Sequence, residues 1–355
     1  MSAGFSARFT HGAALRALCA GVLGVCLLWA VGCGQGGAKL TVMQSPGLLQ
    51  LVAKAQQAPL TTAHLGQRTV HVYVHGVNQG AHHLATIERI ATDGQGGYSL
   101  VAESAAGDLP MDPIDFLAQH ADNAAFYHRF RDFMVRDLEL FLENYELTTM
   151  PVATTVAGRD CVQFSCQRVA GAQVAQGGVF TVSVDAETAF VLAYEERDTS
   201  GQLVAAMQYD SVDYAPNLQG IVFKTVPPEQ VLDLDGNPED QLGFKPYQPK
   251  QLPRGYEFST ARVLSEGPLR HWACLEYTDG VEKLFFLHGG SAPKMLVAPQ
   301  AWTPQFFQEN SPYRMYVTHV GPWTTVQGVW QGQYVVAVGK QPQHEMLELV
   351  ESALP

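Results

Sequence analysis

Five histidines lie close together in the sequence, and imidazole nitrogens are the side-chain atoms here best suited to bind a metal. They are His64, His71, His75, His82 and His83. His71 and His75 would share one face of a strand, so a transition-metal site is one interpretation. The other is a polar strand face followed by a loop. Because no cysteine or carboxylate completes a known ligand spacing, we expect no metal and no other cofactor.

Two further segments match functional motifs only in part. Acidic residues between 233 and 240 surround Gly236, but Gly follows the second Asp directly, which is not the order of an EF-hand loop. A solvated turn is the favoured interpretation. His288-Gly289-Gly290-Ser291 is similar to the oxyanion segment of esterases, yet the chain contains no Gly-x-Ser-x-Gly sequence. Hydrolase chemistry stays an alternative, and we predict that the protein is not an enzyme.

The composition narrows the class of protein. The chain has 355 residues, with 22 Lys or Arg against 34 Asp or Glu, and a net charge of −12. An acidic chain without a basic run lacks the electrostatic footprint of a nucleic-acid-binding protein. The sequence has 46% hydrophobic and 16% charged residues, which is typical of a globular protein of one or two domains.

The N-terminus has the pattern of a secretory signal. Arg8 and Arg16 are the only charged residues before Lys39, and an apolar stretch runs from Ala17 to Val31. This stretch is shorter than the ~20 residues of a membrane-spanning helix. An uncleaved anchor and a cleaved signal without lipid remain alternatives.

The end of the apolar stretch points to lipidation. Ala30-Val31-Gly32-Cys33 resembles the lipobox of bacterial lipoproteins, although Leu is more usual at the first position. We therefore predict a signal peptide over residues 1–32, lipidation of Cys33 and a tether over residues 33–43. No Asp follows the cysteine to retain the protein in the inner membrane. The predicted location is the cell envelope, anchored by lipid and facing the periplasm, with the outer membrane favoured.

Three cysteines remain in the mature chain. Cys161 and Cys166 are five residues apart and would face opposite sides of one strand, too far apart to form a disulfide. A disulfide would need a turn between them or a bond to Cys274. Three buried thiols are the alternative, and the sequence does not decide between the two.

The segment after Asp112-Pro113 has the periodicity of one long amphipathic helix. Its apolar face is unusually rich in aromatic residues. Such a face over a curved sheet would line a groove for acyl chains, since burial of apolar groups is favourable. The alternative is a helix that fills the hollow as ordinary core. The predicted ligand-binding residues are Tyr127, Phe130, Met134, Leu138 and Phe141.

Most of the remaining sequence alternates in the manner of antiparallel strands. Strict alternation is seen over 69–75, and a Gly-rich turn at 93–97 predicts a hairpin. The segment 226–255 holds six of the 20 prolines and is predicted to be a linker. A helix is predicted at 342–354. We expect an α+β protein with a domain over 44–225, the linker, and a smaller domain over 256–355.

Five motifs resemble the superfamily of the periplasmic lipoprotein-handling proteins LolA and LolB and the sigma-E regulator RseB (MucB). The strand and turn run 184–201 resembles all of these proteins, as does the Gly158-Arg159 strand start. Three motifs are similar to two-domain RseB in particular. They are the Pro249 to Tyr256 segment, the hairpin Tyr277-Thr278-Asp279-Gly280-Val281, and the Val335 to Pro342 exit into the last helix.

This resemblance implies a fold and a function. The fold is a curved antiparallel half-barrel covered by helices, with a small α+β C-terminal domain. The function is binding of acyl chains or lipoproteins, as an RseB-like envelope-stress sensor that contacts the periplasmic segment of an anti-sigma factor. A LolA/LolB-like carrier or acceptor of lipoproteins is the alternative. RseB is usually soluble in the periplasm and LolB has no second domain, so Cys33 and the C-terminal part each depart from one of the two patterns.

Overall fold

The computed structural model describes most of the chain after the predicted signal and tether, and residues 41–355 form one compact unit. None of the helices it describes combines the length and the apolar character that a membrane crossing requires. The predicted signal peptide, Cys33 and the tether lie outside the described residues. The structure describes residues 46–76, 80–108, 111–147, 151–169, 178–225, 230–265, 271–290, 305–307, 314–320 and 322–355.

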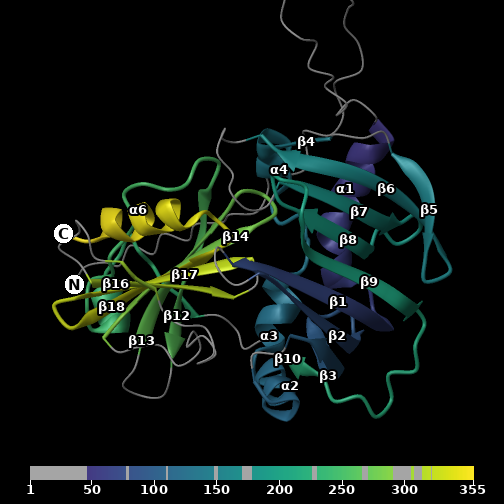
Figure 1. Ribbon diagram of the computed structural model, residues 1–355, viewed down its shortest axis with the longest axis horizontal. Coiled ribbons are helices and arrows are strands. Elements are labelled where there is room, and N and C mark those ends of the chain that lie inside the picture. Colours follow the sequence, from purple (N-terminus) through teal and green to yellow (C-terminus); the bar gives the residue numbers. More distant parts are fainter. Residues whose placement is uncertain are drawn as a thin grey trace, which may run out of the picture. The chain divides into compact units, whose positions relative to one another are not determined.

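The first sheet is antiparallel, has ten strands and curves around helix α1 (Figure 1). Its order is β10-β3-β2-β1-β9-β8-β7-β6-β4, and β5 also pairs with β6. The strands are β1 (His64–Gly76), β2 (Gly80–Thr92), β3 (Gly97–Gly107), β4 (Tyr145–Leu147), β5 (Val152–Val156), β6 (Arg159–Arg168), β7 (Val179–Asp185), β8 (Val191–Arg197), β9 (Leu203–Asp213) and β10 (Lys224–Thr225).

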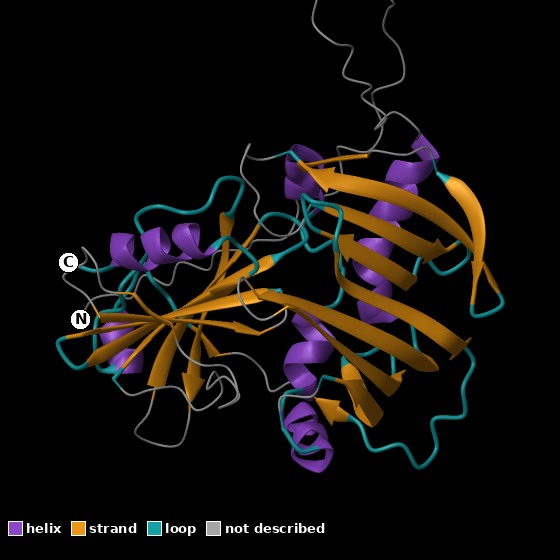
Figure 2. Cartoon of the chain, viewed as in Figure 1, coloured by secondary structure: helices purple, strands orange, loops and turns teal. Residues whose placement is uncertain are grey.

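Helices pack on one face of this sheet (Figure 2). Leu48, Val52 and Ala55 of α1 belong to the same apolar core as Val70 and Ile90 of the strands, since residues two apart on a strand share a face. The helical elements of this part are α1 (Pro46–Thr61), α2 (Pro113–Asp122), α3 (Ala124–Phe126), the π-helix η2 (Tyr127–Arg131) and α4 (Leu138–Asn144).

The second sheet is also antiparallel, in the order β11-β12-β13-β14-β18-β17-β16-β15. The predicted last helix is present as α6 (Gln343–Ala353), which covers one face of this sheet and buries Met346, Leu349, Val350 and Ala353. A short helix, α5 (Pro238–Leu242), precedes the long strands. The strands are β11 (Gln230–Val231), β12 (Glu257–Ser265), β13 (His271–Thr278), β14 (Lys283–Gly289), β15 (Gln305–Phe307), β16 (Arg314–Val320), β17 (Trp323–Trp330) and β18 (Gln333–Gly339).

The predicted α+β class and the curved antiparallel sheet with helices on one face are confirmed. One expectation differs in detail: the proline-rich segment predicted as a linker contains the short elements β11 and α5 rather than coil alone. The division into two domains with a linker stays a prediction.

Candidate functional site

The predicted long helix is wrong: the segment 113–144 is divided into several helical pieces. The chain leaves helical geometry at Asp132, whose backbone is extended, and returns to it at Leu138, with Asp137 as the N-cap. The carboxylate of Asp137 accepts a hydrogen bond from the N–H of Leu140 at 3.0 Å. The aromatic stripe seen in the sequence therefore does not form one continuous face.

A contact with the second sheet explains the break. The backbone N–H groups of Arg136 and Asp137 donate to the carbonyl of Gly280, at 2.8 and 3.3 Å. Gly280 lies in the turn between β13 and β14, and a continuous helix would have used these N–H groups in its own ladder. A partner distant in sequence thus replaces local helical hydrogen bonds.

The five predicted ligand-binding residues are distributed over two environments. Phe141 is 1% exposed and belongs to the core of the first sheet, and the half-buried Tyr127 and Leu138 pack against that core. Phe130 packs instead against the apolar cluster of the second sheet. Met134 is half-buried, and its sulfur lies 3.6 Å from Nη1 of Arg136. These residues belong to one segment of the chain, but their side chains do not share one face.

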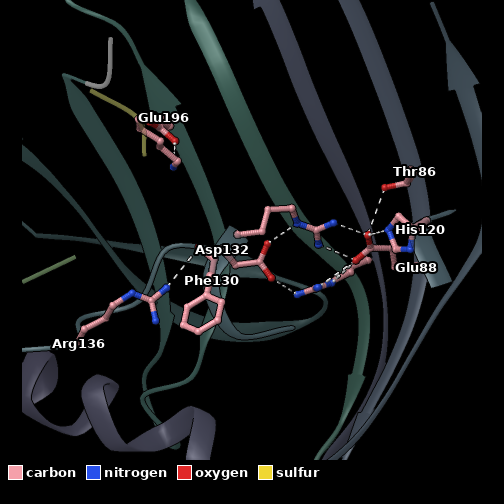
Figure 3. Close-up of polar contacts among 10 residues, drawn as sticks. Thr86, Glu88, His120, Phe130, Asp132, Arg136 and Glu196 are labelled. Carbon is pink, nitrogen blue, oxygen red and sulfur yellow. Dashed lines mark hydrogen bonds and ion pairs between the residues drawn. The ribbon is translucent and has the colours of Figure 1, made fainter. Parts of the chain in front are cut away.

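Phe130 is at the centre of a group of rings and cations. Its ring centroid lies 5.0 Å from that of Phe285 on β14. Three guanidinium carbons approach the Phe130 ring: Arg129 at 5.1 Å, and Arg136 and Arg262 at 5.7 Å each. Figure 3 shows Arg136 beside Phe130. Guanidinium groups are attracted to aromatic faces, so this group holds the segment to the second sheet.

A second feature of the segment is a buried network of charges centred on Glu88 (Figure 3). Arg131 forms a bidentate pair with Glu88, at 2.7 and 2.8 Å. Arg68, directly opposite on β1, donates to the same carboxylate at 3.0 Å. His120 lies 2.8 Å from it, through Nε2. Glu88 is fully buried, so these contacts lie away from water, and those of Arg131 and His120 connect the helical segment to the sheet.

Asp132 closes this network, because its two oxygens bind Arg68 at 2.8 Å and Arg131 at 3.0 Å. Burial alone would raise the pKa of Glu88, but the guanidinium groups of Arg131 and Arg68 outweigh it and hold that pKa well below its usual range. The same two groups lower the pKa of Asp132 against the effect of burial. The positive charges of Arg68 and Arg131 balance the negative charges of Glu88 and Asp132. Because Arg131 belongs to η2, the network fixes η2 on the sheet.

This Glu88 network was not predicted from the sequence, although a signal was present. Arg68 alternates in step with Val70 and Val72 and so shares their face of one strand. Glu88 shares the face of Ile90 on the next strand. A charged residue in the buried phase of each of two neighbouring strands indicates a buried ion pair.

The β13–β14 turn, residues 278–283, enters the first part of the molecule and is called here the docking hairpin. Its Val281 belongs to the core of the first sheet. Arg168 on β6 pairs with Asp279 at 3.2 Å, and the hydroxyl of Tyr145 donates to the same carboxylate at 3.0 Å. The Asp279-Gly280 pair that resembled a family motif is therefore the point where the two sheets are joined.

A buried lysine makes a further contact between the sheets. Nζ of Lys340, at the end of β18, lies 2.7 Å from Glu196 on β8 and 3.0 Å from Glu282 in the docking hairpin. Burial lowers the pKa of Lys340, but these two carboxylates outweigh it and raise that pKa. Burial raises the pKa of Glu282 to about 7, against the attraction of Lys340 and with the repulsion of Glu196.

A pH dependence of stability follows from Glu282. A carboxyl whose folded-state pKa is raised above 4.5 stabilises the fold at low pH, and this contribution is lost as the pH rises to about 7. We expect the free energy of unfolding of the wild type to fall by about 2–3 kcal/mol between pH 5 and pH 8, relative to Glu282→Gln. Denaturant unfolding at several pH values measures this. The prediction would be contradicted if the free energy of unfolding changed with pH by the same amount in both proteins.

The side chains of the other motifs noted in the sequence take part in hydrogen bonds within the fold. Asp233 accepts hydrogen bonds from the N–H groups of Asp235 and Gly236, as expected of a turn. His288 is fully buried and uses both ring nitrogens, on Tyr247 and Gln333, while Ser291 lies outside the described residues. The three cysteines Cys161, Cys166 and Cys274 are buried thiols.

Comparison with known proteins gives matches by structure only. No protein-family model matches the chain, and no curated protein matches it. The Pseudomonas aeruginosa MucA/MucB complex matches with 17% identity over 86% of this chain and 98% of the other, at a TM-score of 0.46. The Mycobacterium tuberculosis lipoprotein LppX matches at 12% identity over 49% and 98%, with a TM-score of 0.25. A LolA superfamily protein from Nitrosomonas europaea matches at 10% identity over 47% and 93%, with a TM-score of 0.20.

Proposed function

We propose that this protein is a cell-envelope binding protein of the RseB kind, which takes acyl chains or acylated proteins at the segment 113–144. The ligand-binding residues proposed are Tyr127, Phe130, Met134, Leu138 and Phe141. The proposal makes the protein a sensor rather than an enzyme. It also includes the lipid anchor at Cys33 and the domain boundaries given above, which rest on the sequence.

One observation carries the proposal: the docking hairpin contacts the very segment that holds the proposed ligand-binding residues. Gly280 accepts hydrogen bonds from Arg136 and Asp137, and Nε of Arg136 donates to the carbonyl of Val281 at 2.8 Å. A ligand that displaces this segment must therefore disturb the contacts between the two sheets. Through such a coupling, binding at one part of a protein changes the conformation or the affinity of another part.

The resemblance of the sequence motifs supplies the ligand and the partner to test. The ligand is an acyl chain, for which the aromatic and aliphatic side chains of the segment offer apolar surface. The partner is the periplasmic segment of an anti-sigma factor, and MucB has been crystallised in complex with MucA(peri). A sensor should change its affinity for that partner when acyl ligand is present, by the reciprocity of linked binding.

A substitution at Phe130 tests the proposed site. We expect Phe130→Asp to abolish binding of a triacylated lipopeptide in native mass spectra, because a carboxylate replaces apolar contact surface. The matched control is Phe258→Asp, since Phe258 is 51% exposed and lies outside the segment. Normal circular dichroism with retained lipopeptide binding in Phe130→Asp would contradict the site.

Met134→Asp provides a second variant if Phe130→Asp does not fold.

A release experiment with the bound lipopeptide separates the sensor from a carrier. A carrier would release its lipopeptide to acceptor vesicles, whereas a sensor would keep it and bind the anti-sigma segment. Release to vesicles without any binding of an anti-sigma segment would replace the sensor proposal with the LolA/LolB-like one.

A further inference from the structure

Strand β3 forms an edge of the first sheet over most of its length. On one side it pairs with β2 from Tyr98 to Gly107. On the other side, among the residues that the structure describes, only the short β10 pairs with it, through Lys224 opposite Tyr98 and Thr225 opposite Gly97 (Figure 1). The stretch 99–107 therefore has a neighbouring strand on one side only. Its last seven residues, 101–107, are called here the open edge.

The open edge presents unused backbone groups to solvent. Along an antiparallel strand, the N–H and C=O groups of alternate residues point to opposite neighbours, so about half of those in the open edge point away from β2. No backbone hydrogen bond from another described segment reaches them. Every residue of the open edge is exposed or half-buried, whereas Gly97, Tyr98 and Leu100 of the same strand are buried. A strand in this condition is a template for pairing with another chain.

The side chains of the open edge leave its backbone accessible and offer apolar surface. Ala102, Ala105 and Ala106 are small, and β3 contains neither proline nor lysine, two residues that commonly prevent pairing at an edge. Val101 is 44% exposed, and Val222, two residues before β10, is 82% exposed. An added strand with apolar side chains at alternate positions would satisfy the backbone groups and cover these valines.

Charges at the open edge favour a basic partner over a second copy of this chain. The side chains of Glu103 on the open edge and of Asp108, directly after it, are 37% and 61% exposed. Glu103 has one cation beside it, Arg89 at 3.5 Å. Opposite charges across a strand pair are stabilising and like charges are destabilising. Two copies paired through this edge would bring the same acidic residues together, and each copy carries a net charge of −12.

We propose that the open edge binds an extended peptide of basic and apolar residues, which adds to the first sheet as a strand antiparallel to β3. This direction is that of β10, which already pairs with the other end of β3. The N-terminal half of the peptide then lies near Asp108 and Glu103, where its lysine or arginine side chains are attracted. The open edge is outside the segment 113–144, so this proposal does not depend on the acyl ligand.

Titration of the purified protein with labelled synthetic peptides, followed by fluorescence anisotropy, tests the open edge. The probe is a peptide of about eight residues, the length of an ordinary strand, that alternates valine and threonine and carries lysines in its N-terminal half. The comparison peptide has glutamates in place of the lysines. We expect the lysine peptide to bind about fivefold more tightly or better, because the exchange turns attraction into repulsion across the strand pair. Bound lysine peptide should also slow amide hydrogen exchange at 101–107, where outer N–H groups gain acceptors.

Glu103→Lys should reduce or reverse the preference for the lysine peptide. The matched control is Glu195→Lys, which makes the same change of net charge at a 50% exposed carboxylate on β8, a strand with neighbours on both sides. This control should keep the wild-type preference. Equal effects of the two substitutions, equal affinity of the wild type for both peptides, or bound peptide with unchanged exchange at 101–107 would overturn the proposal. A wild-type dimer in native mass spectra, with slow exchange at 101–107 in the absence of peptide, would assign the edge to a second copy instead.

Discussion

Glu88→Ala is expected to destabilise the protein by about 3–5 kcal/mol, a large fraction of the roughly 5–15 kcal/mol by which folded proteins are usually stable. The variant leaves the guanidinium groups of Arg68 and Arg131 buried with only Asp132 as a carboxylate partner. It also removes the acceptor of His120. Chemical denaturation followed by circular dichroism measures the effect, and Glu88→Gln, which removes the charge but keeps one of the two acceptor oxygens, should lie between it and the wild type.

The matched control for this prediction is Glu103→Ala. Glu103 is an exposed carboxylate on β3 of the same sheet, 3.5 Å from Arg89 and 2.9 Å from Gln67. Exposed ion pairs contribute about 0–1 kcal/mol, so this variant should stay close to the wild type. Equal destabilisation by the two substitutions would show that burial of the Glu88 network does not matter for stability.

Gly280→Ala is expected to separate the docking hairpin from the first sheet. A Cβ at this position would lie 2.3 Å from the backbone nitrogen of Phe141, and φ of Gly280 is +104°. Backbone atoms cannot rotate away, so overpacking adds to the conformational strain and the sum is about 3–5 kcal/mol. Unfolding measurements should show this loss, and limited proteolysis should show new cleavage near residues 132–137.

Gly332→Ala is the control, because it also changes a glycine in a hairpin turn of the second sheet. Its φ is +78°, but nothing lies within 4 Å of an added Cβ. Only the strain of a left-handed residue remains, at about 1–2 kcal/mol. If Gly280→Ala cost no more than Gly332→Ala, the tight approach of Gly280 to Phe141 would not hold the two sheets together.

Local periodicity was sufficient to predict the elements whose contacts are within their own sheet. Met346, Leu349, Val350 and Ala353 repeat at helical spacing and are all buried in α6. Alternation between apolar and polar residues likewise predicted β1, although the strand extends beyond 69–75 in both directions. In these cases the neighbouring residues and the packing favour the same structure, and the sequence pattern is enough.

Local periodicity failed where the decisive partner is distant in sequence. The aromatic stripe around Phe130 fits a helix, but the carbonyl of Gly280 takes the N–H groups of Arg136 and Asp137 from it. Nothing in the residues around 136 identifies that acceptor, 144 positions away. The sequence of the hairpin 277–281 does not indicate its docking role, which is defined by the contacts of Asp279, Gly280 and Val281.

Amide hydrogen exchange at Arg136 and Asp137 tests the central claim most directly, because these N–H groups connect the proposed ligand site to Gly280. Exchange is followed by mass spectrometry with and without a triacylated lipopeptide, after native mass spectra have shown how much lipopeptide is bound. The account predicts that bound lipopeptide changes the protection of these two amides and of the docking hairpin together. Bound lipopeptide with unchanged protection at 136–137 and 278–283 would contradict the coupling, and absence of any bound lipopeptide would contradict the proposed ligand.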